Sequence, residues 1–243
     1  MYTLQNTMSA KPAASRSATT SPATTTQRIA ESITQAIVER RLMPGTKLAE
    51  QQLADIYACS RTLVRQALNQ LSRDRLVTLE PARGAFVAQP SVDEARQVFE
   101  VRKMLESAML GELALRITPV QIRQLRSHLK QEREAIKRTD VSGRTRLLAD
   151  FHVLLAKQLG NEVLAQLLSD LLSRSSLIAL MYQSSHSATE SQSEHEAIVD
   201  ALEAGDPGAA QQLLDGHLGN VEANLRLNPR INDLKAALQS HAP

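Results

Sequence analysis

The sequence of 243 residues lacks several features that would place it in other classes of protein. Its one cysteine, Cys59, cannot form an internal disulfide, which fits a reducing cytoplasm. No apolar run approaches the roughly 18 residues that span a membrane, and no apolar secretory segment begins the chain. Tryptophan is absent and aromatic residues make up 2%, so the core must consist of aliphatic side chains. We therefore expect a cytoplasmic protein without a membrane segment.

The charged residues are unevenly divided along the chain. Residues 1–90 contain 11 lysines and arginines against 6 acidic residues, a net charge of +5. Residues 91–243 contain 17 against 20, a net charge of −3. A basic front part beside an acidic back part indicates that only the front part meets a polyanion such as DNA, although chance unevenness would give the same numbers.

The pattern of apolar residues predicts two domains between two tails. Residues 1–25 are rich in Ser, Thr, Ala and Pro without helical period, so we expect a disordered tail there, and a second tail over 229–243. A small domain is expected over 26–90 and an all-helical domain over 91–228. The predicted fold class is mainly α, with an N-terminal winged helix-turn-helix and a C-terminal helical bundle.

Periodicity and turn residues place the elements of both domains. In the front domain we expect helices at about 26–41, 50–57 and 61–74, and strands at about 76–79 and 85–88. In the back domain we expect helices at about 91–116, 119–138, 143–159, 161–182, 189–204 and 207–227. Ser60 is the expected N-cap of the third helix, and Pro90-Ser91 is the expected linker between the domains.

The third helix has the composition of a recognition helix. Its outward residues are expected to be Arg61, Thr62, Arg65, Gln66 and Asn69. Arginine is the commonest specific partner of guanine, and Asn or Gln can bind adenine. A solvated charged face would give the same pattern. The basic hairpin tip at Arg83-Gly84 favours DNA binding, because such a wing lies against phosphate or enters the minor groove.

This stretch resembles the GntR family of bacterial regulators over about residues 26–88. The resemblance is carried by LMPGTKLAE at 42–50, SRTLVRQAL at 60–68 and RGAFV at 83–87. It implies DNA contact by Arg61, Thr62, Arg65 and Gly84, with Glu50 and Gln51 near the DNA backbone. Ala58 departs from the usual Gly, which costs up to about 1 kcal/mol if φ is positive there. Ala49 stands where a capping Ser or Asp is common.

Three histidines, His152, His195 and His217, lie on the inward faces of three different expected helices in the back domain. A lone inward histidine is usually a core residue. Three on separate helices of one bundle are better explained by convergence on one site, and imidazole is the commonest metal ligand. A metal-free polar pocket remains the alternative.

The back domain resembles the FCD class of the GntR family over about 91–227. The resemblance is carried by FEVRKMLE at 99–106, DFH at 150–152, EHEAI at 194–198 and GHL at 216–218. It implies a divalent metal ion, zinc or nickel, on the three histidines with a small carboxylate beside it. Relatives place an Asp one helical turn before the first His, where this sequence has Leu148. Asp150 lies about 200° round the helix from His152, so we do not expect it to substitute.

An arginine, Arg102, is the main residue expected to bind the effector beside the histidines. The resemblance places an effector-binding arginine at Arg102, whose guanidinium would take a carboxylate with two hydrogen bonds. An ion pair with Glu106 one turn later is the alternative. Ser191 and Asn224 are expected to line the same pocket. The 174–176 segment and His186 are further candidates.

The sequence therefore predicts a ligand-responsive transcription regulator, a repressor that binds palindromic operator DNA as a homodimer and is released by a small organic acid. No enzyme is expected, because the sequence has no HExxH motif, nucleophile elbow or P-loop, and no carboxylate placed as a base near the three histidines. A metal-dependent hydrolase and a ligand-independent architectural DNA-binding protein are the rival functions. The inward histidines and arginine argue against the second rival.

Overall fold

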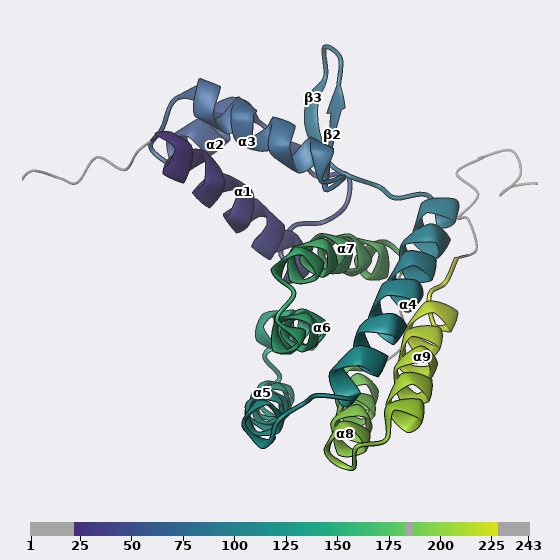
Figure 1. Cartoon of the computed structure of the whole chain (residues 1–243). Helices are drawn as coiled ribbons and strands as arrows, with labels where there is room; N and C mark the ends of the chain where they lie inside the picture. Colours follow the sequence, from purple (N-terminus) through teal and green to yellow (C-terminus); the bar gives the residue numbers. More distant parts are fainter. Residues whose placement is uncertain (1–21, 183–186, 228–243) are drawn as a thin grey trace, which may run out of the picture.

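The computed structural model describes residues 22–182 and 187–227, and the expected tail at 229–243 and His186 lie outside them. The described chain forms a small winged helix-turn-helix that packs on one side of a bundle of helices (Figure 1). This arrangement confirms the predicted fold class. Residues 1–21 of the expected N-terminal tail also lie outside the described part.

The winged helix unit combines three helices with a three-stranded antiparallel sheet of order β1-β3-β2. Its elements are α1 (Pro22–Val38), β1 (Lys47–Leu48), α2 (Glu50–Ile56), α3 (Arg61–Arg73), β2 (Val77–Glu80) and β3 (Gly84–Val87). The prediction of a tail was wrong for 22–25, because Pro22 suits the first turn of a helix. The sequence also missed β1, which is too short to show alternation and pairs Lys47 with Phe86.

Local backbone features of this unit follow from its sequence. Ser60 caps α3, because its side chain accepts a hydrogen bond from the Leu63 backbone nitrogen. Ala49 makes no such bond at the start of α2, as expected. Ala58 has a φ of +48°, so the position where relatives have glycine does require the left-handed conformation. Ile29, Ile33 and Ile37 of α1 form the core with apolar residues of α3 and the sheet.

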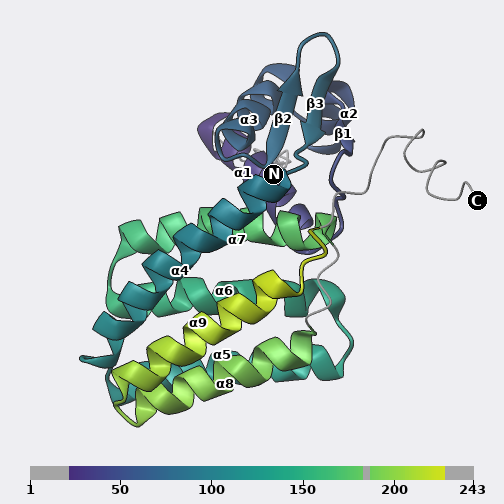
Figure 2. The ribbon, with the colours of Figure 1, turned by 90° about the vertical axis from the view of Figure 1, so that its right-hand side faces the viewer.

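Within the described residues, the bundle contains six helices. They are arranged in two layers, which Figures 1 and 2 show from two directions. The helices are α4 (Val92–Ala114), α5 (Pro119–Lys137), α6 (Val141–Leu159), α7 (Glu162–Met181), α8 (Ala188–Glu203) and α9 (Pro207–Ala223). One layer consists of α7, α6 and α5, and the other of α4, α9 and α8. α6 begins at Val141, two residues before the predicted start at about 143, because the Asp140 side chain caps it by accepting a hydrogen bond from the Gly143 nitrogen.

α7 is the one helix among the described residues that is long and apolar enough to cross a membrane. In the structure it packs against α6, α4 and α1. Its buried Leu168 and Leu172 join the core of the bundle. The apolar composition of α7 is thus that of a core helix.

The winged helix and the bundle share a packed junction. Leu177 of α7 is fully buried and belongs to the hydrophobic core of the winged helix. Tyr182 donates a hydrogen bond of 2.8 Å to the Pro90 carbonyl, across the expected linker. Arg146 of α6 pairs with Glu39 at the end of α1, with 3.2 Å between Nη1 and Oε1. Contacts of α6 and α7 therefore connect the bundle directly to the DNA-binding unit.

Candidate DNA-binding face and effector cavity

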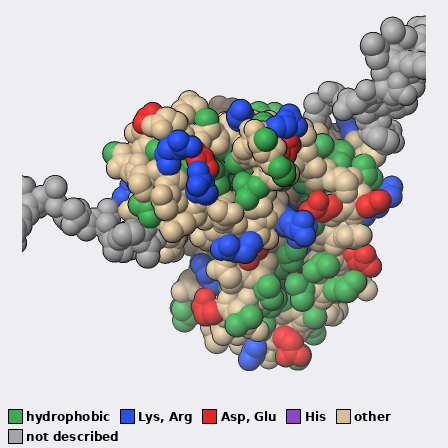
Figure 3. Space-filling model, turned by 90° about the horizontal axis from the view of Figure 1, so that it is seen from above, with side chains coloured by type: hydrophobic (Ala, Val, Ile, Leu, Met, Phe, Trp, Pro, Cys, Tyr) green, Lys and Arg blue, Asp and Glu red, His purple; other side chains and the backbone are tan. Residues whose placement is uncertain are grey.

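Lys and Arg side chains gather on the winged helix where it faces away from the bundle (Figure 3). A groove between α2, α3 and the hairpin carries most of the predicted DNA-binding residues. It is lined by Glu50, Gln51, Arg61, Arg65, Arg83 and Gly84. Lys47, which was not among the predicted residues, lines it as well.

Glu50 organises the two arginines of the recognition helix. Its oxygens accept hydrogen bonds of 2.8 Å from both Nε and Nη2 of Arg65, and one of 3.1 Å from Arg61. These bonds, chiefly those from Arg65, lower the pKa of Glu50 to about 2. The guanidinium groups are therefore held side by side before DNA arrives. The sequence predicted Glu50 near the DNA backbone but did not reveal this contact.

The remaining predicted residues of the face lie outside the groove, on the exposed side of α3. Thr62, Gln66 and Asn69 are exposed on α3. Asn69 donates to the Arg65 carbonyl, and Gln66 accepts from the hydroxyl of Thr26. Gln51, which also lines the groove, donates to Asp55.

The hairpin tip has the geometry expected of a wing. Arg83 pairs with Glu80, and its guanidinium lies 5.3 Å from the centre of the Phe86 ring. Gly84 has a φ of +101°, which favours glycine at this turn. The tip thus presents a cation beside the groove.

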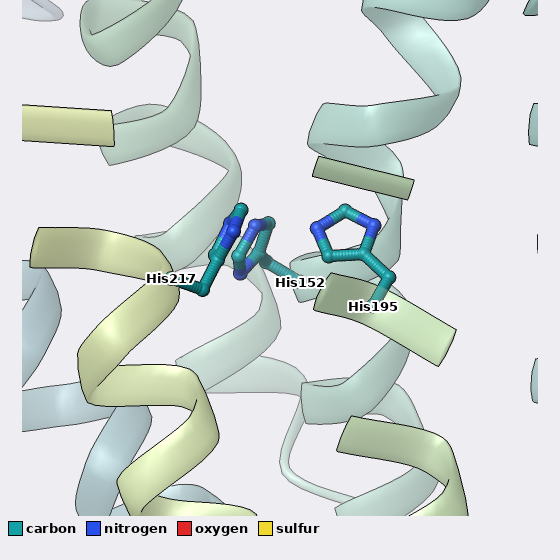
Figure 4. Close-up of side chains that lie close together, drawn as sticks. All are labelled: His152, His195 and His217. Carbon is teal, nitrogen blue, oxygen red and sulfur yellow. The ribbon is translucent and has the colours of Figure 1, made fainter. Parts of the chain in front are cut away.

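The three predicted histidines meet in the centre of the bundle (Figure 4). They come from α6, α8 and α9, and each ring is almost fully buried. One candidate ligand atom from each lies within 4.8 Å of the other two. The Phe151 ring stacks on His195 with 4.0 Å between ring centres. The sequence therefore identified a real cluster. These residues are His152, His195 and His217.

A glutamate stands behind each of the three rings. The Nδ1 atom of His152 lies 2.5 Å from Glu106, and that of His217 lies 2.6 Å from Glu194. Glu132 lies 3.2 Å from Nδ1 of His195. The sequence indicated no carboxylate placed as a base near the histidines and did not predict these three glutamates, which lie against the Nδ1 atoms. An ionised carboxylate only accepts hydrogen bonds, so each Nδ1 carries the proton and each Nε2 is left as the ligand atom.

Burial keeps these imidazoles neutral. It lowers the pKa of His152 and His195 below the ordinary 6.5, and that of His217 to about 4. For Glu106, burial acts in the opposite direction and raises the pKa. The nearby charge of Arg102, together with the hydrogen bonds from His152 and Arg102, outweighs this effect and holds the Glu106 pKa at about 2. Neutral imidazoles backed by ionised carboxylates are the protonation states that metal ligands require.

A cavity of about 430 Å³ opens beside the histidines, large enough for a small metabolite. Arg102 and Ser191 line it, as predicted, and so does Leu148. Ser175 and Ser176 of the 174–176 segment contribute as well. Asn224 does not line the cavity. It ends α9 and donates to the Asn220 carbonyl.

Arg102 combines the two environments that were expected as alternatives. Its Nε donates to Glu106 at 2.7 Å, so the ion pair within α4 exists. The side chain is nevertheless buried and lines the cavity. Its Nη2 atom is buried without a hydrogen-bond partner among the described residues. A buried unsatisfied donor costs about 1–3 kcal/mol, so this atom is placed to bind an acceptor from a ligand.

The histidine centre fits a divalent metal ion. Nε2 of His195 is buried without a hydrogen-bond partner among the described residues, as a vacant ligand atom would be. Three neutral imidazoles with carboxylates behind them are a common donor set for zinc. Leu148 occupies the cavity wall one turn before His152, so it supplies no fourth ligand. Asp150 is exposed and does not line the cavity, as expected.

The fold and the cavity define a DNA-binding regulator with an attached ligand-binding bundle. The model of the family "Bacterial regulatory proteins, gntR family" matches residues 25–87. That of the FCD domain matches residues 97–220, half of the chain. The chain therefore belongs to the GntR family of transcription regulators, in its FCD class. It is a ligand-responsive regulator and not an enzyme.

Relatives agree with this assignment over most of the chain. The transcriptional repressor RspR of Escherichia coli is 27% identical over 203 residues, covering 82% of this chain and 88% of that protein. The galactonate operon repressor of E. coli is 28% identical and covers 77% of this chain and 90% of that protein. A GntR regulator from Rhodococcus sp. RHA1 has a similar structure, with a TM-score of 0.73, 26% identity and coverage of 82% and 96%.

Proposed function

We propose that this chain is a cytoplasmic repressor released from its operator by a small organic acid. The observation that carries the proposal is the cavity in which an unpartnered arginine nitrogen and three carboxylate-backed histidines converge. A regulator without an effector would have no use for such buried polar groups, since they cost stability. The names of two relatives, both repressors, support the sign of regulation.

The effector site combines a metal with the Arg102 guanidinium. His152, His195 and His217 would hold a zinc or nickel ion, which supplies an open coordination position for a carboxylate oxygen. The Nη2 group of Arg102 would donate a hydrogen bond to the same carboxylate. Glu106 positions both sides of the site, because it contacts Arg102 and His152 at once. The metal-free pocket remains the competing account.

DNA recognition is assigned to the face of the winged helix unit that contains the groove between α2, α3 and the hairpin. Arg61 and Arg65 would bind base edges in the major groove, with Thr62, Gln66 and Asn69 beside them on α3. The wing at Arg83-Gly84 and the N-terminus of α2 would lie against the DNA backbone.

The repressor is proposed to act as a homodimer, because one recognition helix reads one half of a palindromic operator. Val101 and Met104 form an exposed apolar stripe on α4, and Met104 is 61% exposed. We assign this stripe to contact with a second copy. Met104→Glu should then convert the dimer to a monomer in analytical ultracentrifugation, whereas Val163→Glu, at an exposed apolar residue of α7, should not.

The experiment for the effector site measures operator release. Purified protein is analysed for metal, and its affinity for the DNA upstream of its own gene is measured by fluorescence anisotropy with and without organic acids. We expect about one metal ion per chain and an acid that weakens operator binding about 5- to 150-fold. Arg102→Gln and His195→Ala should abolish the response to acid.

A matched variant separates the site from general charge effects. Arg123 is exposed on α5 and does not line the cavity, so Arg123→Gln should respond like the wild type. If a chelator leaves the response intact, the metal is not part of the site and the metal-free pocket is correct. If no organic acid changes operator affinity, the proposed class of effector is wrong.

A further inference from the structure

Two arginines at the mouth of the effector cavity have no role in the site described above. Arg40 follows α1 in the winged helix unit, and Arg144 lies on α6 of the bundle. Both line the same cavity as Arg102 and the histidines. The cavity therefore extends from the histidine centre to the junction of the two units.

Arg144 shows how far this cavity extends. Arg144, Leu148 and His152 are spaced by four residues on α6, and all three line the cavity. Eight helical residues span about 12 Å, so the mouth and the histidine centre lie at opposite ends of one wall. A ligand anchored at the histidines therefore points its far end toward the mouth.

The charge at the mouth is uncompensated. Among the described residues, neither Arg40 nor Arg144 has an ion-pair partner, and no acidic side chain lines the cavity. Arg40 is exposed at the mouth, and both partial desolvation by the surrounding protein and repulsion from Arg144 lower its pKa. By contrast, the Arg102 charge is balanced by Glu106. Two like charges held together without a counterion indicate a place for an anion.

The position of Arg40 is fixed by its neighbour Glu39. The Glu39 carboxylate is taken by Arg41 and, across the junction, by Arg146. Its carbonyl accepts a hydrogen bond from Ser142 of α6. Glu39 is therefore unable to neutralise Arg40, and these bonds hold the backbone of Arg40 against α6. Arg40 has a φ of +59°, but Ala58, Arg75 and Thr139 also have positive φ values after other helices of this chain. The backbone conformation of Arg40 alone therefore does not indicate a function.

We propose that the effector is a small dianion, a dicarboxylate, whose second carboxylate is bound by Arg40 and Arg144 at the mouth of the cavity. The inference rests on the proposed function, because it takes the first carboxylate to bind at Arg102 and the histidines. Arg40 then joins the effector directly to the DNA-binding unit. A monocarboxylate would fill the inner site but leave the two arginines without a counterion.

The test compares matched acids on the full-length, zinc-loaded protein after dialysis to remove unbound zinc. Isothermal titration calorimetry is run with succinate, glutarate, adipate and pimelate, and with the monocarboxylates of equal chain length. We expect at least one diacid to bind tenfold or more tightly than its matched monoacid. Arg40→Gln and Arg144→Gln should each remove this preference and leave the affinity for the monoacid unchanged. Arg40→Lys should keep part of the preference, and Arg123→Gln should keep all of it.

The outcomes separate this inference from the proposed function. If monoacids bind in a manner that needs Arg102 but no diacid binds more tightly, the inference fails and the proposed effector site stands. The inference also fails, with the effector site intact, if the diacid preference survives in both Arg40→Gln and Arg144→Gln. If neither class of acid binds, both proposals are overturned. Melting curves of each variant confirm that the exposed substitutions leave the fold intact.

Discussion

A change behind one histidine tests the metal centre more sharply than a change of the histidine itself. Glu194 accepts a hydrogen bond from His217 through one oxygen and from Asn220, at 2.7 Å, through the other. Glu194→Gln keeps the shape and an acceptor oxygen but removes the charge that makes the ring more basic. Loss of such a partner typically lowers metal affinity 10- to 100-fold, about 1.4–2.7 kcal/mol.

Glu194 is the suitable position because its side chain is 24% exposed, whereas those of Glu106 and Glu132 have no exposed surface. Replacing Glu106 would leave Arg102 as a buried, uncompensated charge, at a cost of about 3–5 kcal/mol. That cost would mix a folding defect with a change in metal affinity. At Glu194 we expect the metal-free protein to lose no more than the net worth of one hydrogen bond, about 1 kcal/mol.

Competition with a chromophoric zinc chelator measures the affinity directly. Thermal melts in excess zinc give an independent measure, since metal that binds only the folded state stabilises it by mass action. A loss of 1.4–2.7 kcal/mol lowers the melting temperature by about 3–11 °C for a chain of this size. The control is Glu196→Gln, two residues later on α8, where the carboxylate pairs with Arg133. Equal zinc affinity in wild type and Glu194→Gln would refute the role of this carboxylate.

Three further predictions concern the DNA face and the cavity. Arg65→Ala should cost about 1–3 kcal/mol of binding free energy on the operator and relax base preference at one position per half-site. Arg83→Ala should instead lower the affinity for all DNA sequences evenly and flatten its salt dependence. If wild type and Arg65→Ala gave equal anisotropy titrations with operator and random duplex, the assignment of α3 as the recognition helix would be contradicted. Glu50→Gln should increase affinity for random DNA and reduce discrimination of the operator, because it frees two guanidinium groups; unchanged discrimination would count against a positioning role. Leu148→Asp should strengthen zinc binding in the chelator assay, because it adds a carboxylate one turn before His152; lower stability without tighter zinc binding would favour the metal-free pocket.

The sequence predicted the histidine cluster but not the carboxylates behind it. Periodicity assigns each histidine to the inward face of its own helix, and a bundle brings inward faces together. In sequence, Glu106 and His152 are 46 residues apart, Glu132 and His195 are 63 apart, and Glu194 and His217 are 23 apart. No local spacing therefore connects the members of each pair. A signal was present for Glu106 and Glu132, since Glu132 is a charged residue on an otherwise apolar face of α5, and Glu106 shares the inward face of α4 with Arg102 and apolar residues.

In the front domain as well, the sequence predicted features that depend on neighbouring residues but not contacts between separate helices. The cap at Ser60 is a local backbone requirement, so the sequence predicted it, and the usual Gly of the family at position 58 pointed to the positive φ that Ala58 has. The contact of Glu50 with Arg65 joins two helices across 15 positions and depends on the angle of the helix-turn-helix. The start of α1 was placed too late because composition dominated the prediction for 1–25.

The cavity and the DNA-binding unit are joined by the same two helices. α6 carries His152 and Leu148 on the cavity wall, and also Arg146, which pairs with Glu39 of the winged helix unit. α7 carries Ser175 and Ser176 on that wall, followed directly by Leu177 in the winged helix core. A ligand changes DNA affinity only through a difference in its binding to two arrangements of the protein. Because a helix moves as a rigid element, any arrangement of α6 or α7 that closed around the ligand would also shift their contacts with the winged helix unit. In the proposed dimer, the separation of the two recognition helices must match one turn of DNA, about 34–36 Å, so a small rotation at this junction would weaken operator binding.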